Sequence, residues 1–536
     1  MLSFDEIKSG AGKTLALLRK AVTSEWMMLF EVLLAAVLFL AKKEVECVVT
    51  FVYIISAKLI LSDDSLSAFL PFLLIGLVVL RLYDSFDRFM ALKFVMGVPA
   101  VIGVLFHFFF YRVKPHKGAL TKGYLALSVA LVLGGLFSLP VSHYFSGTSL
   151  YYMFGLGFGM LLLYSALYYK LDPHCAYDMR EYVAKTAFYS AAYCVFIIAV
   201  QYLSNLSVIS TGWEFSLNAL SSIGNNLSTT VLMTMPFCFY LSRKKGVRGA
   251  AAFVVGVLSC AASILSLSRG GLLFTSATCL FYVLFALYKY KDTRARNAIA
   301  LGVMFAIALV VILVWRKQVV KLFEEGIVPT STKVRLALIG AAFATVLFTA
   351  VVYALFKMEN GKRLRIFVYI AAGAAVLALV AFIALWDKVK ELAVEMDSYR
   401  GRMMIVAANN FKKYPIFGTG IGYRGLRDIY ANKEGMFGCY HCLPVQVVGS
   451  MGLVGVAAYL YMLKERFTTL RHAPDKEYAA IVFFSYLGLV YMSFVNPGIF
   501  CPVVYGLQLA IYYISAERSG EFDSPSENRV LTKQTE

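Results

Sequence analysis

One histidine stands where a long hydrophilic stretch meets an apolar run, and its side chain could act in proton transfer. His441 lies in the sequence CYHCLP, directly before the apolar run 443–463. Imidazole is the side chain that takes and returns a proton near neutral pH most readily. It could therefore serve as a base. The alternative is an interfacial histidine that makes a single hydrogen bond.

Several arginines fall on the same side of the predicted topology. Arg269 lies in the sequence SLSRGG, between two apolar runs with almost no loop. A charge there is costly unless it reaches the interface or finds a partner. The hydrophilic stretch 387–442 holds nine basic and six acidic residues, and its arginines are Arg400, Arg402, Arg424 and Arg427.

A guanidinium fork matches phosphate oxygens, whereas an ammonium is only a point charge. The excess of positive charge in 387–442 therefore favours an anionic ligand, such as a lipid-linked phosphate. Two simpler interpretations stay open. Arg269 could reach the interface beside a glycine helix stop, and the lysines could belong to a solvated amphipathic helix.

The composition shows what must position these residues. The chain has 536 residues, of which 60% are hydrophobic and 15% charged, and its mean hydropathy is +0.71. A soluble domain carries about a quarter charged residues, so this is a polytopic membrane protein. The net charge of +19 is explained by basic cytoplasmic loops, and nucleic acid is not an expected partner.

The apolar runs predict an all-α fold, a polytopic transmembrane helix bundle of about 12–16 spans with one long extracytoplasmic loop that contains short helices. The run 47–62, which contains Lys58, is the least certain of the candidate membrane spans. Basic connections lie on one side of the membrane together with both termini, and the positive-inside rule makes that side cytoplasmic. They include Arg112 to Lys122, Arg243 to Arg248, Lys289 to Arg296, Lys357 to Arg365 and Lys464 to Lys476.

Six segments follow from this topology. They are a cytoplasmic amphipathic segment 1–25, N-terminal membrane helices 26–203, central membrane helices 204–386 with the outer-face arginine, an extracytoplasmic loop 387–442, C-terminal membrane helices 443–516 and a disordered cytoplasmic tail 517–536.

Four motifs occur in order over roughly residues 220–465. Asn225 precedes Pro236 in one apolar run, SRG ends another at 268–270, and Tyr399-Arg400 is followed by NNFKKYPIFGTGIG at 409–422. His441 is followed by Gln446, Gly449, Gly452 and Gly455. Together they resemble the O-antigen ligase and polymerase family of polytopic membrane glycan transferases. One position departs from the family pattern, because Cys442 follows the histidine where the family often has asparagine.

The resemblance implies a metal-independent transferase that needs no cofactor. It would move an oligosaccharide from an undecaprenyl-diphosphate carrier to a glycan or lipid-linked acceptor hydroxyl, at the outer face of a bacterial plasma membrane. Arg269 and Arg400 would hold the diphosphate, with Arg402 as the alternative to Arg400. His441 would be the base or orienting group. The supporting candidates are Arg424, Tyr440 and Asn225, and polymerase and ligase are not distinguished.

The main alternative is a transporter or flippase for lipid-linked oligosaccharides. Such a protein should bury charges near the middle of the membrane or show two related halves. Charged residues within the apolar runs are few, and the clearest are Glu31 and Lys58. The pair Asp63-Asp64 suggests a metal-dependent glycosyltransferase, but the predicted topology places it on the cytoplasmic side.

Overall fold

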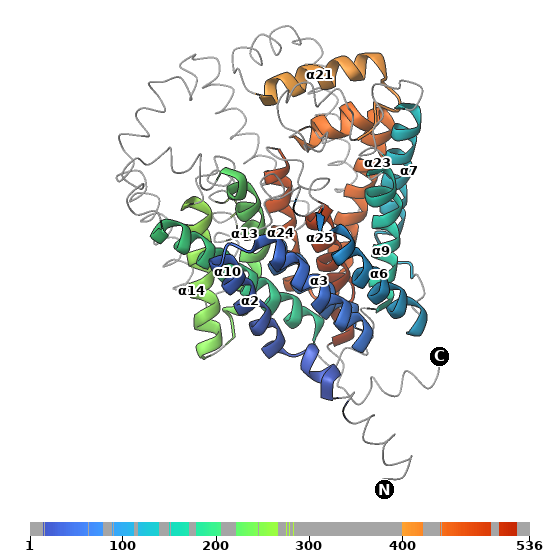
Figure 1. The fold of residues 1–536 in the computed structure, drawn as a ribbon. Coiled ribbons are helices and arrows are strands. Elements are labelled where there is room, and N and C mark those ends of the chain that lie inside the picture. Colours follow the sequence, from blue (N-terminus) through green and yellow to red (C-terminus); the bar gives the residue numbers. More distant parts are fainter. Residues whose placement is uncertain are drawn as a thin grey trace, which may run out of the picture.

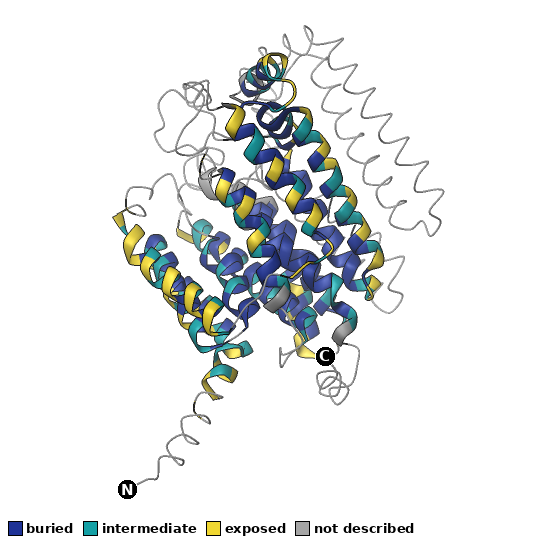
Figure 2. Ribbon diagram, turned by 90° about the vertical axis from the view of Figure 1, so that its right-hand side faces the viewer, coloured by how far each residue is buried: buried dark blue, intermediate teal, exposed yellow. Residues whose placement is uncertain are grey.

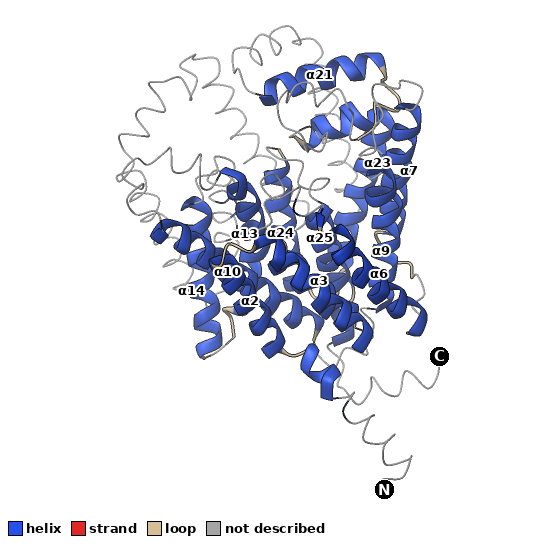
Figure 3. Cartoon of the chain, in the orientation of Figure 1, coloured by secondary structure: helices blue, strands red, loops and turns tan. Residues whose placement is uncertain are grey.

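The structure is a computed structural model. Apart from a few isolated residues, it describes 17–62, 64–78, 91–111, 116–138, 152–170, 178–204, 221–244, 246–265, 399–421, 440, 442–494 and 503–522. Every regular element in these ranges is helical, and none of them contains a strand (Figure 3). The prediction of an all-α membrane fold is confirmed.

The first half of the chain supplies a series of mostly short helices. They are α2 (Glu25–Leu40), α3 (Glu44–Leu61), α4 (Ser65–Pro71), the π-helix η1 (Phe72–Gly76), α6 (Lys93–Phe110), α7 (Thr121–Ser138), the π-helix η2 (Tyr152–Gly159), α9 (Met160–Lys170) and α10 (Met179–Ser204).

The remaining helices include the longest one. They are α13 (Ser221–Leu241), α14 (Val247–Leu265), α21 (Tyr399–Lys413), α23 (Leu443–His472), α24 (Lys476–Ser493), α25 (Val503–Glu517) and the 3-10 turn η5 (Ser519–Phe522). Figure 1 shows α21 lying across the top of α23 and α7 rather than running along them.

Among the described residues, three helices are long and apolar enough to cross a membrane: α6, α10 and α23. On the outward face of α6, large apolar side chains such as Phe94 and Phe109 are exposed. Figure 2 shows the same contrast across the molecule, with exposed residues on the peripheral helices and buried residues at the centre. An apolar surface of this kind suits lipid rather than water.

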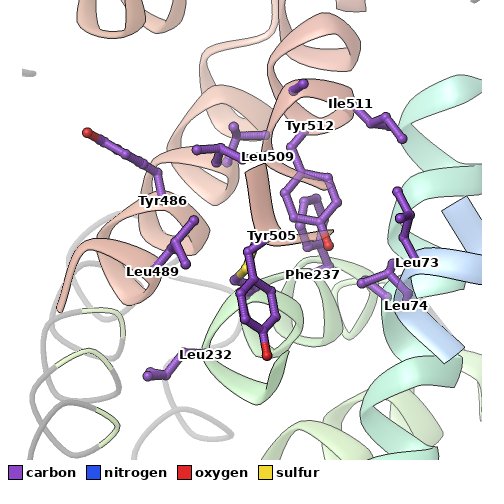
Figure 4. Packing of buried hydrophobic residues seen from close by; sticks show 14 of the residues in the cluster. Leu73, Leu74, Leu232, Phe237, Tyr486, Leu489, Tyr505, Leu509, Ile511 and Tyr512 are labelled. Atoms are coloured by element: carbon purple, nitrogen blue, oxygen red, sulfur yellow. The ribbon is translucent and has the colours of Figure 1, made fainter. Parts of the chain in front are cut away.

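The centre of the bundle is formed where α13, α24, α25 and η1 meet (Figure 4). The rings of Phe237 and Tyr512 lie with their centroids 4.8 Å apart. The side-chain amide of Gln508 donates to the carbonyl of Leu73, at 2.8 Å. A polar group inside an apolar core costs free energy unless it is hydrogen-bonded, and this bond satisfies the freed carbonyl near the π-helical turn.

Ion pairs gather at one end of the bundle, which we call the ion-paired end. There Arg180 pairs with Asp475 (3.0 Å) and Lys185 pairs with Glu25 (2.7 Å). Arg243 also pairs with Glu477. These contacts join the starts of α2, α10 and α24 to the end of α13. Individually such partly exposed pairs contribute at most about 1 kcal/mol, but together they fix which helix ends are neighbours.

The chain's last described helix returns to the same end. The Glu517 carboxylate accepts hydrogen bonds from the backbone N–H of Ala119 (3.1 Å) and the hydroxyl of Tyr168 (3.0 Å). Ala119 stands just before α7. Because α7 then runs for 18 residues, about 27 Å at 1.5 Å per residue, its other end lies on the far side of the bundle.

The charged run around Lys58 forms a helix because its charge is neutralised inside the bundle. The Lys58 ammonium lies 2.6 Å from a Glu31 carboxylate oxygen, and both side chains are buried. The same ammonium donates to the carbonyl of Ser67 at 2.8 Å. Asp64 has a structural role as the N-cap of α4, where it accepts from the backbone N–H of Leu66.

One sequence prediction is wrong in extent. The basic connection expected from Lys464 to Lys476 is only residues 473–475, since α23 continues to His472. Neither glycine nor proline occurs between Lys464 and Pro474, so the chain stays helical through its charged residues. Arg466 is therefore not in a cytoplasmic loop but is buried in the bundle.

Candidate active site at the α21 end of the bundle

The structure describes the predicted site residues to different extents. Tyr440 is fully described and completely buried. Arg400 and Arg402 lie on α21, and Asn225 lies on α13. For these three residues only the backbone is described. His441, Arg269 and Arg424 lie outside the described residues, so their expected meeting stays a prediction. Within the described residues, no group of three or more His, Cys, Asp and Glu is placed to hold a metal ion.

Helix α21 is fastened to the start of α23 through one face. Met403 and Ala407 are buried and pack with Tyr440, with Val406 and Val445 at the edge of the cluster. Residues spaced by three and four share a face of a helix. This small apolar stripe is what holds a helix rich in basic and polar residues against the bundle.

Tyr440 connects the two helices through both its side chain and its backbone. Its hydroxyl accepts a hydrogen bond from the side-chain amide of Asn410 on α21, at 2.9 Å. Its backbone N–H donates to the side-chain oxygen of Gln446 on α23, at 2.6 Å. The residue immediately before His441 is therefore held from two directions.

Gln446 extends this connection into α23. Its side chain is fully buried, and its amide N–H donates to the Ser450 hydroxyl at 2.9 Å. Its backbone N–H donates to the carbonyl of Cys442, at 2.8 Å. Cys442, the N-cap of α23, and Tyr440 thus have fixed backbones on either side of position 441. Buried and fully paired polar groups of this kind make a local structure rigid.

The turn that follows α21 inserts into an interruption of α23. The backbone N–H groups of Leu453 and Val454 donate to the carbonyls of Pro415 and Ile416, at 2.9 and 3.1 Å. In an unbroken helix they would donate four residues back, to Gly449 and Ser450.

The carbonyls of Gly449 and Ser450 accept hydrogen bonds from the turn instead. Gly449 accepts from the backbone N–H of Thr419 (3.4 Å), and Ser450 accepts from that of Gly420 (2.8 Å). The turn and the helix have exchanged hydrogen-bonding partners. These two N–H groups and two carbonyls of α23 are therefore all paired, as buried backbone requires.

Two glycines make the exchange possible. Gly452 adopts φ +61° and ψ −154° inside α23, a region that is essentially restricted to glycine. A Cβ atom there would lie 2.6 Å from the carbonyl oxygen of Ile416. Gly418 has φ +70°, and a Cβ would lie 2.4 Å from the backbone of Ser450.

The PIFGTG motif therefore has a structural explanation. It forms the turn that docks into α23. Phe417 also stacks on Phe137 near the end of α7, with ring centroids 3.9 Å apart. Because α7 begins at the ion-paired end, α21, the turn and Tyr440 lie at the opposite end, which we call the α21 end.

Replacing Gly452 with alanine is expected to destabilise the protein by about 2–4 kcal/mol, because the side chain adds backbone strain and overpacking. The glycan transfer that the motif resemblance leads us to expect should fall with it, since the turn is displaced from α23. Thermal unfolding and activity of the purified protein measure both effects.

Gly97 in α6 offers a matched control, because a Cβ atom there would meet nothing within 4 Å. The Gly97→Ala protein should unfold within a degree or two of the parent, since its change in stability is no more than about 1 kcal/mol. A Gly452→Ala protein with parental stability and activity would show that the interruption is not required.

Sequence reasoning did not single out Asn410 and Gln446 as functional. Asn410 stands in the NNFKK motif, and Gln446 follows His441 by five residues in a motif. Their polarity in otherwise apolar surroundings was a usable signal, because buried amides need partners. Which partners they have depends on the packing of α21 on α23, and sequence spacing does not reveal that.

Chemically, the described part of the site is a rigid frame around one position. It fixes the backbone next to His441 and the axis of the helix that carries Arg400 and Arg402. Preorganised positions of this kind are what catalysis by orientation needs.

The comparison with known proteins points to the same part of the chain. Residues 326–460 match the family model Wzy_C, described as O-antigen ligase. No curated protein and no solved structure matches the chain. The matched range includes α21, the docked turn, Tyr440 and most of α23, and it supports glycan transfer in a membrane. The resemblance found in the motifs is thus confirmed by the match of residues 326–460, about a quarter of the chain, to the O-antigen ligase family.

Proposed function

We propose that the protein transfers an oligosaccharide from an undecaprenyl-diphosphate carrier to an acceptor hydroxyl. In this proposal His441 is the base or orienting group, and Arg269 and Arg400 hold the diphosphate. The observation that carries it is the assembly of α21, the docked turn and Tyr440 on α23, which fixes the backbone beside His441.

The sidedness of the molecule supports a reaction at the outer face. Short connections at the ion-paired end carry many Lys and Arg residues, among them Arg243, Lys244 and Arg248. By the positive-inside rule this end, with both termini, would face the cytoplasm of a bacterium. The α21 end would then face outward, where a lipid-linked glycan meets its acceptor.

The chemistry is consistent with the residues proposed. A diphosphate leaves readily once its developing charge is stabilised, and two guanidinium groups can supply that stabilisation. The acceptor hydroxyl must lose a proton as it attacks the sugar carbon, and a neutral imidazole can accept it. The carbon–oxygen bond to the carrier breaks as the new glycosidic bond forms.

Position 400 suits this role better than position 402. At about 100° per residue, the two positions lie nearly on opposite sides of α21. Position 400 stands three residues before Met403, within the register of the stripe that faces α23. Arg400 is therefore proposed as the phosphate ligand of the helix.

The deciding experiment incubates the purified protein with a polyprenyl-diphosphate oligosaccharide and follows the lipid-linked products. Growth of the glycan on its carrier indicates a polymerase, and transfer to a different acceptor indicates a ligase. Activity is expected to persist in a chelator. If no glycan is transferred to any acceptor while the substrate moves across a vesicle membrane, the flippase alternative replaces this proposal.

A further inference from the structure

A charged side chain that forms no ion pair with a described carboxylate is buried at the other end of the molecule. Arg466 of α23 is 1% exposed. Two of its guanidinium nitrogens, Nε and Nη1, are buried and have no hydrogen-bond partner. Met462 and Leu470, one turn away on either side along the helix, are fully buried. The side chain therefore does not reach the surface at this depth.

No described carboxylate neutralises this charge, because Arg466 is absent from every ion pair between the described residues. An arginine cannot lose its proton in a protein. An isolated buried ion costs several kcal/mol even after relaxation. A bound anion at this position would lower that cost.

The surroundings of Arg466 consist of tyrosines. Its guanidinium carbon lies 5.2 Å above the ring of Tyr486. The hydroxyl groups of Tyr124, Tyr486 and Tyr513 are buried and also lack hydrogen-bond partners. These tyrosines interact electrostatically with Arg466. Tyr124 and Arg466 interact directly, yet the Tyr124 hydroxyl and two of the guanidinium nitrogens have no acceptor within hydrogen-bond geometry.

A cavity adjoins these donors. It is lined by Arg466 and Tyr124 together with Gly506 and the apolar side chains of Leu127, Leu131, Leu156 and Met160, and its volume is about 20 Å³. On the same measure a single water molecule needs roughly 10–15 Å³. The cavity therefore admits one particle a little larger than water, and a phosphate with its four oxygens does not fit.

We propose that this cavity binds a single small monovalent anion, chloride or a similar halide, between the Arg466 guanidinium and the Tyr124 hydroxyl. A halide accepts hydrogen bonds from both donors and neutralises the buried charge, which a water molecule does not. The apolar walls of the cavity suit a weakly hydrated ion. The site belongs to α7, α23 and the neighbouring helices and is independent of the proposed glycan transfer.

The test is the stability of the full-length protein in detergent as sodium chloride replaces sodium gluconate at constant ionic strength. We expect a saturable rise in Tm of roughly 2–4 °C. Bromide should act like chloride, and sulfate should not. Chlorine NMR line broadening reports the binding directly.

Three variants sharpen the result. Arg466→Met should remove the chloride-dependent shift and unfold at a higher temperature than the parent in gluconate, since no charge remains to be neutralised. Tyr124→Phe keeps the side-chain shape and should raise the half-saturating chloride concentration about tenfold. Lys464→Gln removes a positive charge from an exposed side chain of the same helix and should keep the full shift.

The outcomes separate the occupants. A parent protein whose Tm is indifferent to all anions would contain only water in this cavity, and the proposal would be overturned. A shift with sulfate or phosphate but not with halides would overturn it in favour of an oxyanion or a lipid headgroup. A chloride shift that survives in Arg466→Met would place the ion elsewhere and would overturn it as well.

Discussion

Replacing His441 with alanine is expected to lower the rate of glycan transfer by about 10²–10⁴-fold, the usual contribution of a general base. The protein should still insert and fold, because Tyr440 and Gln446 hold the surrounding backbone without the imidazole. Initial rates with a polyprenyl-diphosphate oligosaccharide measure the effect. The KM for the donor should change little, since the imidazole is not proposed to bind the diphosphate.

Cys442 provides the matched control for this experiment. It is the other chain neighbour of His441, and its side chain makes no capping hydrogen bond to α23. Cys442→Ala should retain most of the activity. Full activity in His441→Ala would end the proposed mechanism, whereas equal losses in both proteins would show that the start of α23 has been disturbed.

The second large effect is expected at the arginines. Arg269→Ala and Arg400→Ala should each lower the transfer rate by about 10²–10³-fold, the cost of removing one group that stabilises developing charge. Lysine at either position should restore activity only in part, because an ammonium lacks the two-pronged geometry that grips phosphate oxygens. The same assay measures each rate, and thermal unfolding confirms that each protein is folded.

Arg402 serves as the comparison on the same helix. It carries the same charge two residues further along α21, on nearly the opposite side. Arg402→Ala should lose less than tenfold. A larger loss at Arg402 than at Arg400 would exchange their proposed roles, and an unaffected Arg269→Ala protein would contradict a diphosphate site that includes this residue.

The helical membrane fold could be predicted because a segment in lipid must be apolar and must satisfy its own backbone hydrogen bonds, and both properties can be read from the local sequence. Residues 93–110 form α6 almost where the apolar run 91–111 predicts it, since an exposed apolar helix satisfies its own backbone. The run around Lys58 was harder to interpret. Its charge is acceptable only because Glu31, on another helix, lies against it, and no periodicity within the run reveals a distant partner.

For Arg466 the sequence rule erred in the other direction, because it assigned a buried residue to a loop. A cluster of basic residues after an apolar run is typical of a cytoplasmic loop, and that rule assigned Lys464, Arg466 and Arg471 together. The Lys464 side chain is exposed, whereas Arg466 turns inward among tyrosines from other helices. The rule describes the average of a cluster, while burial is decided residue by residue by the neighbouring helices.

The candidate site was predictable in its residue types but not in its construction. The sequence indicated a glycine turn after α21 and glycines after His441 as separate motifs. That they are one unit depends on a helix that gives up two of its own hydrogen bonds to another segment. Such an exchange between positions about 35 residues apart leaves no regular spacing in the sequence.

The exchange of backbone partners also limits how this protein could be re-engineered. In the sequence, the hydrophilic stretch 387–442 looks like a detachable cassette. It is not, because its turn completes the ladder of a membrane helix. A chimera whose imported loop lacks the turn at Thr419 and Gly420 would leave the carbonyls of Gly449 and Ser450 without these donors. A working graft must carry the host helix as far as Val454 along with the loop.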